Sequence, residues 1–172
     1  MTARGLAVVC LAMGALLMAS VASALACTND GAYPGAVSAP ASSRAVQCRV
    51  NEQRAAVGLR GLWRDRRLAR AAQRFSDAMV RERFFDHVSP EGSTLGQRAR
   101  AAGYAGRMVG ETLGWGSGDL ATPAAIVAAW MASPPHHAIL MARQFRRIGL
   151  GVTSGSPEGD ADAATVTADL GT

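Results

Sequence analysis

The sequence contains no lysine. All 18 of its basic residues are arginines, set against 13 acidic residues, and the formal net charge is +5. An all-arginine set indicates a bias in coding composition rather than an adaptation to nucleic acid, so we expect no nucleic-acid partner. A charge of this size is compatible with contact to anionic cell-wall polymer or lipid headgroups, but it does not by itself favour such contact.

The chain also lacks internal repeats. Its only low-complexity stretch is residues 27–43, which are rich in Gly, Pro, Ala and Ser. A length of 172 residues is typical of one domain. We expect residues 27–43 to form a flexible N-terminal segment and residues 44–172 to form the folded domain.

The N-terminus has the pattern of a secretory signal peptide. Arg4 provides a positive charge, Leu6–Leu17 is an apolar run, and Ala22–Ala26 contains the A-x-A cleavage pattern in two registers. An uncleaved membrane anchor is the alternative, because apolar and small residues continue to Cys27, near the ~20 residues that a span needs. The cleavage pattern favours the signal peptide. We therefore predict removal of residues 1–26, a secreted protein and no transmembrane segment in the mature chain.

Cysteine is scarce as well, with three in the chain. Cys10 would leave with the signal peptide, and Cys27 and Cys48 would remain. Two thiols in an oxidising compartment predict one disulfide, which would tie the N-terminal segment to the first helix. The alternative is a lipidated Cys27 and an unrelated Cys48. Ala24 and Leu25 are the wrong residue types for the usual lipobox, which favours the disulfide.

Hydrophobic periodicity predicts four or five helices and about three short strands. The helices are expected from Arg44 onward and at Arg66–Phe84, Thr94–Ala102, Ala124–Met131 and Pro134 to about Arg143. The strands come late and include Arg147–Val152 and Ala164–Leu170. Because the strands do not alternate with helices in βαβ fashion, the pattern favours an α+β fold with an antiparallel sheet.

The apolar faces of these elements predict a core. Residues at helical spacing on one face of the second helix are expected to be buried, together with one residue each from the fourth helix and the first late strand. Trp63 is available to cover this core. The expected core residues are Leu68, Phe75, Met79, Trp130 and Ile148.

The candidate chemistry lies in the histidines and one glutamate. His87 precedes a Ser-Pro-Glu-Gly turn, and His136 and His137 lie in a Ser-Pro-Pro-His-His segment whose Ser133 is a predicted N-cap. Glu111 stands among apolar and Gly residues, where a carboxylate needs water or a partner. Two histidines and a glutamate are ligand types of an open zinc site. By themselves, the same residues equally indicate turn histidines and a capping carboxylate.

Several motifs occur in one order within about Val46 to Gly171: VNEQRAAVGLRGL, FFDHVSPEGSTLGQRARAAGY, GETLGWG, AWMASPPHHAIL, FRRIGLGV and TVTADLG. In this order they resemble the bacterial CAP (SCP-like) domain, of the superfamily of cysteine-rich secretory proteins, antigen-five allergens and plant pathogenesis-related proteins. The resemblance implies an α-β-α sandwich with a small antiparallel sheet of about three strands. It also implies a cleft of two histidines and two acidic residues, which in some members binds a divalent metal, often zinc.

Carried over residue by residue, the resemblance implies a cleft formed by His87, Glu111, Ser133 and His136. His87, Glu111 and His136 match the family's two histidines and first acid, and are the implied metal ligands. Ser133 stands where the second acid belongs, so the metal set is incomplete and Zn²⁺ or another divalent cation is no certain cofactor. Thr112 also departs from the pattern, since the family has asparagine after the glutamate.

Two functions follow from the resemblance. The favoured hypothesis is a secreted, monomeric, non-catalytic binding module whose cleft takes a lipid, cell-wall or protein ligand. The alternative is a metal-dependent extracellular hydrolase using His87, Glu111 and His136 to activate water. A purely structural role is a third possibility, because members with this fold differ in function. A nucleophilic role of Ser133 is disfavoured, since an N-cap serine uses its oxygen for backbone N–H groups.

Overall fold

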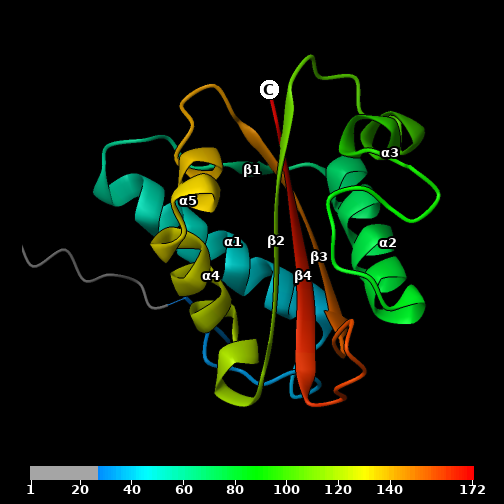
Figure 1. The fold of residues 1–172 in the computed structure, drawn as a ribbon. Coiled ribbons are helices and arrows are strands. Elements are labelled where there is room, and N and C mark those ends of the chain that lie inside the picture. Colours follow the sequence, from blue (N-terminus) through cyan, green and yellow to red (C-terminus); the bar gives the residue numbers. More distant parts are fainter. Residues whose placement is uncertain (1–26) are drawn as a thin grey trace, which may run out of the picture.

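The computed structural model describes residues 27–172, so the predicted signal peptide, residues 1–26, lies outside the described part. Three layers form the domain (Figure 1). The helices α1, α4 and α5 lie on one side of a four-stranded sheet, and α2 with α3 lies on the other. The predicted α+β sandwich is confirmed.

The helices follow the predicted order. Within residues 27–172 they are α1 (Ala39–Ala56), α2 (Arg66–Glu82), α3 (Leu95–Ala101), α4 (Pro123–Ala132) and α5 (Pro134–Leu140), with a 3₁₀ turn at Gly118–Ala121. The first helix begins at Ala39, five residues before the predicted Arg44. Pro40 lies in its first turn, where a fixed φ suits the helix and the missing N–H is not needed. The small residues there carry no apolar periodicity, so the sequence pattern did not reveal this turn.

The sheet has four strands, which corrects the expectation of about three antiparallel ones. They are β1 (Trp63–Arg64), β2 (Val109–Ser117), β3 (Arg147–Ser154) and β4 (Ala163–Gly171), in the order β1-β3-β4-β2. The pairs β2–β4 and β3–β4 are antiparallel, whereas β1 pairs with β3 in parallel. Two residues are too few for alternation to show in the sequence, which is why β1 was not predicted.

Helix α2 lies directly on β3 because two glycines leave room for it. A Cβ atom at Gly149 would come within 2.1 Å of the backbone of Leu68 and Ala69, and one at Gly151 within 2.4 Å of that of Ala72. Any side chain at either position would therefore push the helix off the sheet. This close approach is what holds the α2 layer against the two central strands.

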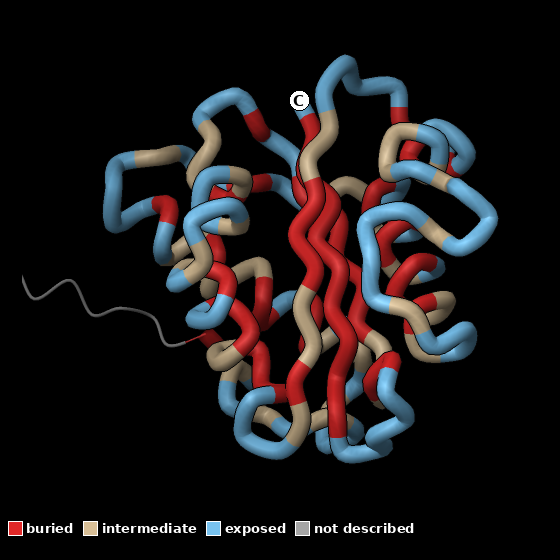
Figure 2. Tube along the Cα trace, in the orientation of Figure 1, coloured by how far each residue is buried: buried red, intermediate tan, exposed pale blue. Residues whose placement is uncertain are grey.

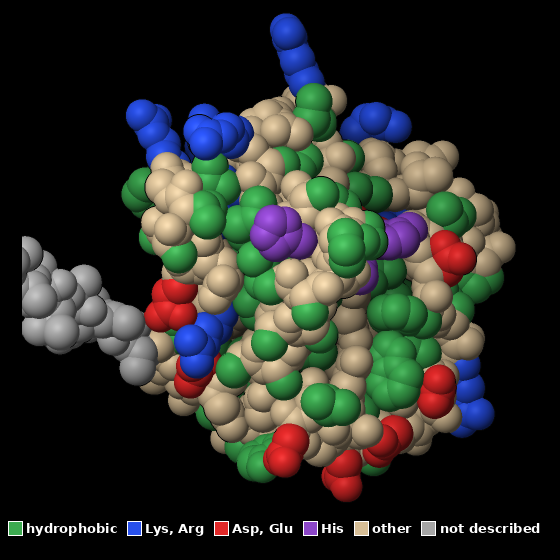
Figure 3. Space-filling model, turned by 60° about the vertical axis from the view of Figure 1, so that its left-hand side comes forward, with side chains coloured by type: hydrophobic (Ala, Val, Ile, Leu, Met, Phe, Trp, Pro, Cys, Tyr) green, Lys and Arg blue, Asp and Glu red, His purple; other side chains and the backbone are tan. Residues whose placement is uncertain are grey.

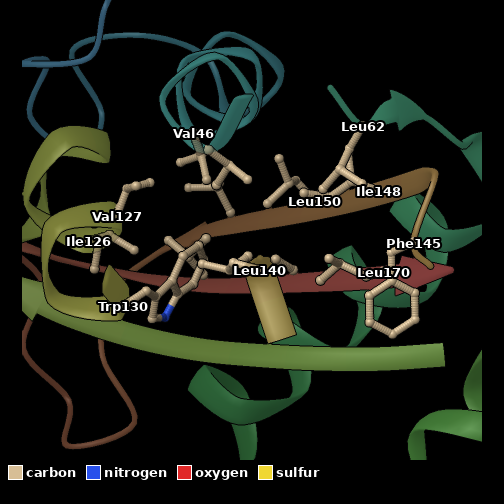
Figure 4. Close-up of a cluster of buried hydrophobic side chains, with 14 residues drawn as sticks. Val46, Leu62, Ile126, Val127, Trp130, Leu140, Phe145, Ile148, Leu150 and Leu170 are labelled. Carbon is tan, nitrogen blue, oxygen red and sulfur yellow. The ribbon is translucent and has the colours of Figure 1, made fainter. Parts of the chain in front are cut away.

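The largest core lies between the sheet and the α1–α4–α5 layer (Figure 4), where Trp130 packs among aliphatic side chains from α1, α4, β3 and β4. In Figure 2 the two central strands are buried along almost their whole length. The predicted core is confirmed, since its five residues are all buried: Leu68, Phe75, Met79, Trp130 and Ile148. Trp63 is the exception: it lies on the edge strand β1 and is 72% exposed, so it does not cover the core.

An arginine lies on the same buried face of α1 as Val46 and Val50. Arg54 is fully buried. Its Nε donates to the carbonyl of Arg60 at 2.9 Å, and its Nη1 to that of Leu140 at 2.6 Å. Burial lowers its pKa from the ordinary arginine value, and the charge of a neighbouring arginine adds to the effect. The guanidinium therefore joins α1 to the C-terminal end of α5.

The N-terminal segment is covalently attached to α1. Cys27 and Cys48 form a disulfide with Cα atoms 5.7 Å apart, as predicted, and Cys27 is buried. A Cys27 sulfur bonded to Cys48 has no valence left for a lipid. Of the helices within residues 27–172, none combines the length and apolarity that crossing a bilayer requires.

Candidate functional site

Two of the predicted site residues meet at the edge of the sheet. Glu111 is the third residue of β2, and its buried side chain faces the α2 layer together with Leu113, which packs against Phe75. His87 comes from the connection between α2 and α3. Its Nδ1 lies 2.8 Å from Oε1 of Glu111. The imidazole is half exposed and the carboxylate is 3% exposed, so the pair is buried on the glutamate side and open on the histidine side.

Arg98 of α3 completes this cluster, although the sequence reading did not single it out. Its Nη2 donates to Oε2 of Glu111 at 2.6 Å, and its Nη1 to the carbonyls of Ser93 and His87. The guanidinium lies 3.4 Å from the centre of the Phe75 ring. Arg98 thus neutralises the buried carboxylate and also holds the loop that carries His87. Both oxygens of Glu111 are engaged.

His136 approaches from the other layer of the sandwich. It lies in α5 and, with Ser133, lines a cavity of about 230 Å³ whose other walls are apolar and aromatic: Phe85, Leu113, Gly114, Trp115, Ile126, Ala129 and Trp130. The pKa of His136 is lowered, first because burial penalises the charged imidazole and then because the charge of His87 acts on it. His87 and His136 therefore face a common region from opposite sides of β2. Figure 3 shows histidine side chains on one face of the molecule.

Ser133 is at the predicted N-cap position, but it does not act as predicted. Its side chain makes no capping hydrogen bond to the α5 backbone. The expectation that the helix uses up its oxygen is wrong: Pro134 and Pro135 offer no N–H at the first two positions, and the N–H of His136 at the third does not donate to it. Ser133 instead lines the cavity beside His136. His137 is exposed, as expected.

The donor groups do not fit a three-ligand metal site as they are arranged. In residues 27–172, the ligand atoms of His87, Glu111 and His136 do not all lie within 4.8 Å of one another. Both oxygens of Glu111 already have partners, and the positive charge of Arg98 offsets the charge that would attract a cation. Glu111 is placed to orient His87 rather than to share a metal with it.

Sequence reasoning missed a second carboxyl group at this site. Asp169 of β4 is directly opposite Glu111 across the antiparallel pair and is fully buried. Neither of its oxygens has a hydrogen-bond partner among the described residues. Burial raises its pKa well above the ordinary aspartate value of 3.8, and the charge of Glu111 raises it further. A lone aspartate within the apolar strand TVTADLG was the available signal.

Known proteins resemble this chain in sequence. The model of the cysteine-rich secretory protein family (CAP) matches residues 48–168. The uncharacterized protein YkwD of Bacillus subtilis is 33% identical over 124 residues, which is 69% of this chain and 47% of YkwD. The chain thus spans about half the length of this curated relative.

Solved structures share the fold. An outer surface protein of Borrelia burgdorferi has a TM-score of 0.68 at 19% identity, over 79% of this chain and 96% of that one. An extracellular protein of Bacillus anthracis that contains an SCP domain has a TM-score of 0.64 at 21% identity, over 78% and 44%. With the family match over more than half of the sequence, these findings show that the chain belongs to the cysteine-rich secretory protein (CAP) family.

Proposed function

We propose that the protein is a secreted binding module whose cleft, formed by His87, Glu111, Ser133 and His136, takes an apolar group of a lipid, cell-wall or protein ligand. The cavity beside His136 carries this proposal, because its walls are mainly apolar and two polar residues, Ser133 and His136, line it together. Such a combination binds an apolar group and orients a polar one.

The size of the cavity limits the ligand. At about 230 Å³ it is below the roughly 300–1,000 Å³ of pockets that enclose a drug-sized molecule. It therefore suits a single apolar group or the end of one acyl chain, with the rest of the ligand outside. Among the three ligand classes, a lipid chain matches the aromatic and aliphatic walls best.

The state of Glu111 favours binding over hydrolysis. A general base must be free to take a proton from water, whereas Glu111 is paired with both His87 and Arg98. A metal-dependent hydrolase would need the two histidines and the glutamate to converge, and among the described residues their ligand atoms are not grouped within 4.8 Å of one another, which supports binding instead. Secretion is part of the same proposal, and an N-terminus at Cys27 in protein recovered from the medium would test it.

A fluorescent fatty acid, cis-parinaric acid, tests ligand binding. We expect it to bind to wild-type protein and to lose most of its affinity in Ala129→Trp, which fills the cavity. Ala128→Trp is the matched control, because Ala128 is the exposed neighbour on the same helix and does not line the cavity. Equal binding by both variants would place the fatty acid elsewhere and contradict the proposal.

Zinc titration calorimetry tests the alternative. We expect no stoichiometric zinc binding to wild-type protein, because the ligand atoms of His87, Glu111 and His136 are not grouped within 4.8 Å of one another. Zinc bound one-to-one by wild type and lost in both His87→Ala and His136→Ala would favour the hydrolase instead.

A further inference from the structure

The loop segments at the two ends of the sheet carry opposite charge. At one end β2 and β3 begin and β4 finishes, so Arg147 is paired with Gly171 and Val109 also with Gly171. The segments that form this end, residues 58–64, 103–108 and 141–147, contain no acidic residue. They carry six exposed arginines: Arg60, Arg64, Arg107, Arg143, Arg146 and Arg147.

The opposite end has the reverse composition. It is formed by residues 27–38, 117–122 and 155–162, which contain five acidic residues and no arginine. These segments are joined to one another, since Tyr33 donates to Asp119 at 2.5 Å and the Gly118 N–H to the carbonyl of Asp162 at 3.0 Å. In Figure 3 the upper end of the molecule carries several arginine side chains and the lower end several acidic ones, with further arginines in the lower half.

Two large apolar side chains project from the arginine-rich end. Trp63 is 72% exposed and Met108 is 48% exposed. Trp63 is in register with Arg147 on the neighbouring parallel strand, so the two side chains lie on the same face of the sheet. Met108 directly precedes β2, and its carbonyl accepts from the Thr172 N–H at the same end. Neither exposed side chain contributes to the core described above.

From these observations we infer that the arginine-rich end is a docking surface for an anionic lipid bilayer. Arginines near a membrane are attracted to anionic headgroups. Tryptophan and other amphipathic or apolar side chains settle at the headgroup level. The acidic end is repelled by the same surface. The opposite charges of the two ends therefore also set the orientation of the protein, with its arginine-rich end toward the bilayer.

The distribution of the arginines favours a bilayer over a single polyanionic chain. They come from three separate segments and surround projecting apolar side chains, which an extended polymer would leave in water. A flat surface can meet all of them at once. This inference is independent of the proposed ligand cleft, although Glu111 lies only two residues from the start of β2, roughly 7 Å along the strand from this end.

Vesicle co-sedimentation tests the surface. The protein is used in its processed form, residues 27–172, which contains the whole described fold. We expect it to bind vesicles of phosphatidylcholine with phosphatidylglycerol, and not phosphatidylcholine alone, with binding that weakens as salt rises. The double variant Arg107→Gln, Arg147→Gln should bind about tenfold or more weakly. Both side chains are exposed, so the fold should be unaffected.

The matched control is Arg70→Gln, Arg74→Gln, which removes the same charge from the exposed face of α2. It should bind vesicles within about twofold of wild type. Trp63→Ala should also weaken binding, and the tryptophan emission of wild type should shift to the blue on vesicles. Equal losses in the two double variants would show a net-charge effect and overturn the proposal. So would capture by soluble dextran sulfate together with no vesicle binding.

Discussion

Glu111 on β2 and Asp169 on β4 are directly opposite each other across an antiparallel strand pair, and both carboxyl groups are buried. Like charges at such positions repel strongly in a low-dielectric interior. Glu111 has Arg98 and His87 as partners, whereas the oxygens of Asp169 accept from no donor among the described residues, and its side-chain contact is the Glu111 carboxyl itself. Burial and the charge of Glu111 therefore raise the pKa of Asp169 and favour its protonated form.

Asp169 should make the protein less stable as the pH rises. Its pKa in the folded state is above the ordinary value of 3.8, so the native protein keeps a proton that the unfolded chain releases. The resulting stabilisation is complete below pH 3.8, declines above it and is gone once the pH passes the folded-state pKa. Asp169→Asn should remove this decrease of stability with pH and raise the free energy of unfolding at neutral pH. Urea denaturation at a series of pH values from 4 upward measures the free energy of unfolding.

The control for this prediction is Asp162→Asn, since Asp162 is exposed in the loop before β4. It should leave the pH dependence of stability close to that of wild type. An Asp169→Asn protein with the wild-type slope would mean that another group takes up the proton.

Arg98 should be essential for stability because it neutralises a buried carboxylate. Arg98→Met leaves Glu111 buried with its charge uncompensated on one side and should cost about 3–5 kcal/mol. The double variant Arg98→Met, Glu111→Gln should recover more than half of that loss. Chemical denaturation of both variants measures these changes in stability. Arg100→Met, at an exposed position of the same helix, should change stability by no more than about 0.5 kcal/mol.

Arg54 should be equally difficult to replace. Arg54→Leu deprives the carbonyls of Arg60 and Leu140 of their donor within a buried region, and we expect a loss of at least about 3 kcal/mol. Arg54→Lys should restore only part of it, because one ammonium group cannot reach carbonyls on both sides. A denaturation midpoint that did not move in Arg54→Leu would mean that water replaces the guanidinium.

The disulfide should contribute through the unfolded state. Cys27 and Cys48 are 21 residues apart, and closing a loop of that length is worth roughly 3 kcal/mol in the chain-entropy model. Replacing both by Ser should lower stability by about this amount. Mass spectrometry without reductant should find the wild-type protein two hydrogens lighter than its reduced form. A diacylglyceryl group on Cys27 would contradict the prediction.

Much of the helical layer was predictable because its signals are local. Leu68, Phe75 and Met79 repeat at helical spacing, and Thr122 with Pro123 marks the start of α4 as a cap and a first-turn proline do. The start of α1 and the strand β1 could not be predicted, because they carry no such local signal. Small residues around Pro40 carry no periodicity, and the two residues of β1 are a strand only because β3 lies beside them.

The candidate site was likewise predictable only in part. His87, Glu111 and His136 could be selected by residue type and motif, but their mutual geometry could not. Arg98 becomes a site residue only because α3 folds back over Phe75, and Asp169 only because β4 pairs with β2 in one register. A register shifted by one residue would turn Asp169 to the other face of the sheet.

By itself, the sequence determined the family, the order of the helices, the cysteine pair and the candidate histidines and glutamate, since each depends on residue type and short-range spacing. Only the tertiary structure decided that His87 and His136 approach β2 from opposite layers, that Arg98 engages Glu111, and that six arginines from three separate segments meet at one end of the sheet. The physical reason is that charge pairing and burial depend on distances in space, and strand pairing sets those distances between residues far apart in the chain.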